Sequence, residues 1–157
     1  MIDIELKDIP ALRVISVEHT GSIAGVSRAF TELYSRAVAA GAPVGAPPLT
    51  IYPESPREFD PGDVTFSVCL PLAGELGELP EGLDVVELPA ATAATAVHEG
   101  PYEGIGAVYD GLVRWCEREG YRVTPPVREV YLVGPDPDGH RSPVEFRTEV
   151  QFPAEKA

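Results

Sequence analysis

The stretches IPALRVISVEHTGSIAG (residues 9–25) and LPAATAATAVHEGPYEG (residues 88–104) resemble each other when the chain is shifted by 79 positions. The register continues without a gap until Tyr52 lies over Tyr131, and ten of the 43 pairs from residue 10 to residue 52 are identical. Several identities are glycines and prolines, whose backbone roles few other residues can fill. This similarity predicts a duplicated module.

The first copy has the pattern of a strand, a helix and two further strands. A β-branched run at residues 12–17 is typical of a buried strand. From residue 22 the apolar residues recur at helical spacing, over about 18 residues, and Gly41 stands where a left-handed helix cap is expected. Residues 49–53 and 64–70 then predict a hairpin across a turn at residues 60–63.

The second copy repeats this order. It has a strand at residues 93–97, a helix opened by Pro101 and ended by Gly120, and two strands paired across a turn-rich segment at residues 136–143. We therefore expect an α+β fold, with two β-α-β-β modules related by a pseudo-twofold axis. In this fold the strands form an antiparallel sheet, and two helices pack on it.

The length and composition indicate one domain over residues 1–157. The 157 residues are 44% hydrophobic, enough for one self-sufficient core. We expect the first repeat at residues 2–72, an acidic, glycine-rich linker at residues 73–82 and the second repeat at residues 83–153. A seam between related modules is a place where small-molecule pockets form.

The charge and the cysteines exclude several classes of function. A net charge of −13 is the wrong sign for a chain that grips nucleic acid or anionic lipid by itself. The two cysteines, Cys69 and Cys116, lie too far apart for a metal knuckle, and they form no disulfide framework. With no secretory signal and no membrane-spanning stretch, we expect a cytoplasmic protein without a metal or a cofactor.

One strand carries a candidate binding group, Glu129. Side chains alternate along a strand, so Glu129 and Tyr131 share a face. In the repeat alignment Tyr131 matches Tyr52, whereas Glu129 matches the neutral Thr50. The seam would then be lined by two tyrosines and one acid, which suits a flat, lipophilic cation. The alternative is that Glu129 is a solvated strand glutamate.

Other residues invite two interpretations. His19 and His98 align in the two repeats, and each ends a predicted strand just before a helix. Each could form hydrogen bonds that stabilise the turn there, or it could have a catalytic role. Trp115 fits either the core or a pocket wall. The remaining aromatic candidates for the pocket are Phe66, Tyr102 and Tyr109.

Three motifs in order resemble a known family. HEGPYE (residues 98–103), PPVREVYL (residues 125–132) and TEVQFP (residues 148–153) are similar to the GyrI-like small-molecule-binding domain, which is also the effector-binding domain of AraC- and MerR-type multidrug regulators. The resemblance covers nearly the whole chain. It implies that Glu129 lies at the base of an aromatic pocket and meets lipophilic cations.

The resemblance leaves three functions open. The chain has no helix-turn-helix segment, so we expect a stand-alone binder of hydrophobic, cationic drugs or toxins, in which Glu129 selects charge and Tyr52 and Tyr131 stack on the ligand. One alternative is a hydrolase of cyclopropane-bearing genotoxins with Glu129 as the general base. The other is a gyrase-inhibitor-like module that docks on a protein, such as gyrase or a regulator. Monomer and homodimer both remain open.

Overall fold

The structure is a computed structural model, which describes residues 3–22, 25–45, 47–53, 62–74, 77, 81–134 and 142–157. Half of the predicted linker, at residues 75–76 and 78–80, and parts of both predicted turns, at residues 60–61 and 136–141, lie outside the described residues. The elements are β1 (Glu5–Ile9), β2 (Leu12–Gly21), α1 (Val26–Ala39), β3 (Leu49–Tyr52), β4 (Val64–Pro71), β5 (Asp84–Leu88), β6 (Ala91–Glu99), the short 3-10 helix η3 (Tyr102–Gly104), α2 (Gly106–Glu119), β7 (Tyr121–Val123), β8 (Val127–Val133), the 3-10 helix η4 (Pro143–Glu145) and β9 (Arg147–Lys156).

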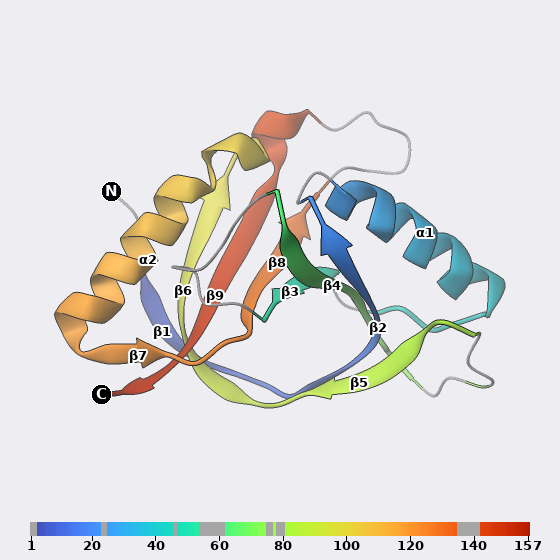
Figure 1. Cartoon of the computed structure of the whole chain (residues 1–157), viewed down its shortest axis with the longest axis horizontal. Coiled ribbons are helices and arrows are strands. Elements are labelled where there is room, and N and C mark those ends of the chain that lie inside the picture. Colours follow the sequence, from blue (N-terminus) through green and yellow to red (C-terminus); the bar gives the residue numbers. More distant parts are fainter. Residues whose placement is uncertain are drawn as a thin grey trace.

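The predicted α+β class is confirmed. The strands form one curled antiparallel sheet in the order β1-β6-β9-β8-β3-β4-β2-β5, and β7 pairs with β9 beside this path. Figure 1 shows α1 and α2 toward opposite ends of this sheet, with β8 and β3 between them. The central β3–β8 pair joins the two halves of the chain, so the halves share one sheet.

The sheet contains strands that the sequence patterns did not predict. β5 pairs with β2 of the first half, and β1 pairs with β6 of the second half, so each half lends a strand to the other. Outward from the central pair, the strands follow as β3-β4-β2-β5 on one side and as β8-β9-β6-β1 on the other. Two similar modules that each give one strand to the other would have this order. The duplication itself remains a prediction.

The helices agree with the expected pattern, with shifted starts. α1 begins at Val26 rather than near residue 22, and Gly41 just beyond it has the expected left-handed backbone, with φ 69°. Gly120 caps α2 with φ 76°. Pro101 precedes the 3-10 helix η3 instead of opening α2, which begins at Gly106. Among the described residues no helix is both long and apolar enough to cross a membrane.

Both helices pack on the same face of the sheet, here called the helix face. The α1 core includes Phe66 and Val68, and the α2 core includes Val150 and Phe152. Val68 lies opposite Thr50, Thr50 opposite Glu129, and Glu129 opposite Val150, and residues directly opposite each other in a sheet point to one face. The middle of the helix face therefore lies between two hydrophobic cores.

The other face of the sheet is also partly buried. A third cluster, which contains Val14, Leu49 and Cys69, lies there. Arg128, which is 2% exposed, points to this face because it alternates with Glu129. Its Nη2 donates a hydrogen bond to the Pro89 carbonyl oxygen at 3.0 Å, and its Nε and Nη1 have no partner among the described residues.

Candidate functional site

Glu129 lies in the middle of β8, at the centre of the helix face. Thr50 of β3 is its cross-strand neighbour on one side and Val150 of β9 on the other. Thr50 is fully buried, whereas Glu129 keeps some accessible surface although protein surrounds its carboxylate.

Two phenols hold the Glu129 carboxylate. The Tyr109 hydroxyl, from α2, donates a hydrogen bond to Oε2, and the Tyr131 hydroxyl donates one to Oε1 at 3.2 Å. The Thr50 hydroxyl lies 2.8 Å from the Tyr131 oxygen. Because Tyr131 has a single proton and gives it to Glu129, Thr50 is the donor in this second bond. The result is a relay from Thr50 through Tyr131 to Glu129.

The surroundings shift the titration of these groups. Burial raises the pKa of Glu129, although hydrogen bonds from Tyr109 and Tyr131 and the nearby His98 act in the opposite direction. Burial, and then the Glu129 charge, raise the pKa of Tyr109 and of Tyr131 well above the usual tyrosine value. Both phenols therefore stay protonated at neutral pH and remain donors.

Aromatic rings surround the carboxylate from several elements. The Tyr131 ring meets Phe30 of α1 edge-on at 5.6 Å and Tyr102 of η3 at 5.9 Å. Tyr102 also stacks on Phe146 at 5.2 Å, and Tyr109 packs on Phe152 at 5.6 Å. The site combines one acid with a lining of aromatic faces.

Sequence reasoning did not single out Phe30, Phe146 or Phe152 as part of this aromatic lining. Phe30 had a signal in the repeat alignment, where it matches Tyr109. Phe146 and Phe152 had none beyond the alternation of their strand, which indicates core as readily as a site wall.

The predicted site residues lie at different distances from this centre. Tyr131 and Tyr109 donate hydrogen bonds to Glu129, and Tyr102 contacts the ring of Tyr131. Tyr52 is buried in the α1 core, and burial together with the Glu129 charge raises its pKa. The charge of Glu129 therefore acts on Tyr52, and the role of Tyr52 in stacking on a ligand remains a prediction.

Phe66 and Trp115 lie in the two hydrophobic cores. Phe66 is buried beneath α1 and stacks on His19 at 5.6 Å. Trp115 packs against the α2 core and stacks on Tyr121 at 5.4 Å. No ring contact found among the described residues joins either side chain to Glu129 or its phenols, and their role in a pocket wall remains a prediction.

His98 supports the site from β6. Its Nε2 lies 2.7 Å from the Pro101 carbonyl oxygen, so the ring nitrogen is the donor, and this bond ties β6 to the start of η3. A Cβ added at Gly104 would lie 3.0 Å from His98 Cε1, which shows how closely η3 packs on the ring. His98 thereby helps to place Tyr102 over Tyr131. Within the described ranges, no group of His, Cys, Asp and Glu has the arrangement of a metal site.

Comparisons with known proteins agree on the family. Residues 2–155 match the model of the GyrI-like small molecule binding domain. The crystal structure of the EcmrR C-terminal domain is similar with a TM-score of 0.89 and 26% identity, and the match covers 100% of this chain and 99% of that one. In the cryo-EM structure of the EcmrR–DNA complex the identity is again 26% and the TM-score 0.89, over 99% of this chain and 58% of the EcmrR chain.

More distant structures share the fold alone. A protein solved with bound tetraphenylphosphonium has 15% identity and a TM-score of 0.64, over 98% of this chain and 94% of its own. A hydrolase from Listeria innocua has 15% identity and a TM-score of 0.65, over 98% and 92%. The comparison with curated proteins found no significant match.

Proposed function

Because the chain belongs to the family of GyrI-like small-molecule-binding domains, we propose that it binds hydrophobic cations on the helix face, above Glu129. The observation that carries this proposal is a carboxylate deep in the protein, surrounded by aromatic rings, with no ion pair to a described Lys or Arg side chain. Glu129 selects the charge of the ligand, and Tyr131, Tyr52, Tyr102 and Tyr109 supply aromatic surface.

The energetics favour a cation over a neutral ligand. An ionised carboxylate in a poorly solvated site lacks the stabilisation that a counter-charge would provide. A cation over an aromatic face gains about 0.5–2 kcal/mol for each ring, and the gain is largest when water is excluded. Both phenolic protons already point at the Glu129 oxygens. A delocalised cation therefore gains the charge interaction without breaking these bonds.

Tetraphenylphosphonium is a suitable probe, since a protein of this fold was solved with it. We expect calorimetric titration to show binding to the wild type and a loss of about tenfold or more in Glu129→Gln, which keeps the shape of the side chain and removes its charge. Glu87→Gln, an exposed glutamate on β5, is the matched control and should bind like the wild type.

A neutral probe separates charge from shape. Triphenylphosphine oxide carries similar rings without a net charge, so its weaker affinity should be similar in the wild type and in Glu129→Gln. Equal affinity of tetraphenylphosphonium for both proteins would show that Glu129 does not select charge. No binding of the cation to the wild type would remove the proposal for this class of ligand.

The raised pKa of Glu129 also favours a second candidate, hydrolysis of a strained-ring electrophile. A carboxylate with a raised pKa is a better general base, and it would take a proton from the water whose oxygen bonds to a ring carbon. The ring C–C bond then breaks, and the released carbon takes up that proton, so the product gains one water. Mass spectrometry of a cyclopropane-bearing compound after incubation would then show a mass increase of one water, absent with Glu129→Gln. Intact compound after long incubation with the wild type would exclude this activity for that compound.

A further inference from the structure

Among the described residues, the edge of β6 has no strand partner over its last four residues. β1 pairs with β6 only from Ile9 opposite Ala91 to Glu5 opposite Thr95. Beyond Thr95 the strand continues to Glu99 with β9 on one side, and no described residue pairs with it on the other. Ile4, just before β1, packs against the α2 core.

The outward backbone groups of this edge can be assigned. The Gly100 N–H donates to the Phe146 carbonyl oxygen at 2.8 Å, which continues the β6–β9 register by one residue. Backbone groups alternate between the two sides of a strand, so Ala96 and His98 face β9 like Gly100. Val97 and Glu99 therefore present their N–H and C=O groups to the open edge.

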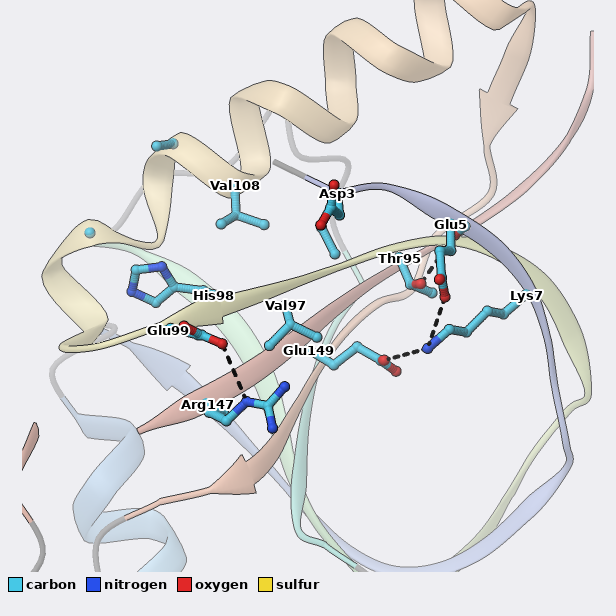
Figure 2. A pocket seen from close by; sticks show the side chains of 13 residues that line it. Asp3, Glu5, Lys7, Thr95, Val97, His98, Glu99, Val108, Arg147 and Glu149 are labelled. Atoms are coloured by element: carbon cyan, nitrogen blue, oxygen red, sulfur yellow. Dashed lines mark hydrogen bonds and ion pairs between the residues drawn. The ribbon is translucent and has the colours of Figure 1, made fainter. Parts of the chain in front are cut away.

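A groove of about 640 Å³ runs along this edge, between β1, β6 and the start of α2. Figure 2 shows Val97 beside Glu99, with the ion pairs Glu99–Arg147 and Glu149–Lys7 along one side. Toward α2 the groove is lined by small and apolar groups, among them Ala107 and Val108.

The charge of the groove is negative. Its described lining has four carboxylates and two basic side chains: Asp3, Glu5, Glu99 and Glu149 against Lys7 and Arg147. Both basic side chains already form ion pairs within the groove. Of these carboxylates, Asp3 and Glu99 are exposed to solvent. A partner that carries positive charge fits this lining better than a neutral or an acidic one.

We propose that the open edge of β6 binds an extended, basic peptide segment of a partner protein, which adds a strand to the sheet. The backbone of the added strand bonds to Val97 and Glu99, as in other peptides that extend a sheet. Its alternate side chains divide between the two sides of the groove. Basic residues face Asp3 and Glu99, and small apolar residues lie against Ala107 and Val108.

Labelled peptides test this site independently of the ligand site at Glu129. The probe is an acetylated and amidated Arg-Val-Lys-Val-Arg peptide, and the matched peptide has Glu at the three charged positions. We expect fluorescence anisotropy to show binding of the basic peptide only, with an affinity that falls as salt rises. In hydrogen-exchange NMR the Val97 and Glu99 amides should become protected, while the Tyr109 and Tyr131 signals stay unchanged.

Two variants separate the backbone bonds from the charge. Val97→Pro removes an outward N–H without touching the β6–β9 ladder, and proline is tolerated on such an edge. It should weaken binding about tenfold, whereas the control Val97→Thr keeps the N–H and the affinity. Asp3→Asn combined with Glu99→Gln should reduce the salt dependence.

Equal affinity of the basic peptide for Val97→Pro and the wild type would overturn strand addition. Equal affinity of the basic and acidic peptides, or protection centred on Glu129, would overturn the proposed partner. Because Glu129→Gln should leave peptide binding unchanged, failure of this proposal is distinguishable from failure of the proposed ligand site.

Discussion

Removal of the Tyr109 hydroxyl tests the electrostatics of the Glu129 site. In Tyr109→Phe the ring remains on Phe152, but Glu129 Oε2 loses its donor. A hydrogen bond to a charged group is worth about 1.5–3 kcal/mol, and one between neutral groups about 0.5–1.5 kcal/mol. The variant should therefore lose about 1 kcal/mol more stability when Glu129 is ionised than when it is protonated.

The direction of the pH dependence follows from the raised pKa of Glu129. The folded protein holds a proton there more tightly than the unfolded chain does. The stability from this site is complete below the ordinary glutamate pKa, and it is lost as the pH rises through the raised value. Tyr109→Phe removes a donor that favours the ionised form, so it should raise the pKa of Glu129 further and deepen this loss.

Two measurements check the reasoning. Carbon-13 NMR of the Glu129 side-chain carboxyl identifies the pH ranges in which it is protonated and ionised. Urea unfolding, followed by the fluorescence of the single tryptophan, Trp115, then gives the free energy of unfolding in each range. Tyr34→Phe, an exposed tyrosine on α1, is the control and should be neutral. An equal loss of stability in both ranges would refute the assigned bond.

Two further variants probe other packing features. Arg128→Met should raise the free energy of unfolding, measured in urea, by about 1 kcal/mol. The variant removes a buried charge and loses only the hydrogen bond to the Pro89 carbonyl oxygen. A clear loss of stability would show instead that the guanidinium is well paired. Gly104→Ala places a methyl group against the His98 ring. We expect a destabilisation of about 1–3 kcal/mol and weaker binding of tetraphenylphosphonium. Unchanged melting temperature and affinity would contradict the role of η3 in placing Tyr102.

Local patterns were sufficient for the elements that depend on neighbouring residues. Helical spacing and the two glycines predicted α1 and α2, and alternation predicted the pairing of β3 with β4. Alternation also placed Glu129 and Tyr131 on one face, and their hydrogen bond confirms this. β5 was missed because its charged residues, Asp84 and Glu87, are three positions apart and break the alternation of a half-buried strand, and because its partner lies in the other half of the chain.

The sequence by itself determined which residue types occupy one face of β8, because side-chain direction follows from the alternation of a single strand. Only the tertiary structure decided what meets them there. Tyr109 reaches Glu129 from a helix, and Thr50 reaches Tyr131 from a strand 81 residues away. These contacts depend on the register between strands and on how the helices pack, both of which are set by the whole core rather than by any local pattern. The edge of β6 that no described residue pairs with has the same origin, because it begins where the pairing of β1 with β6 ends.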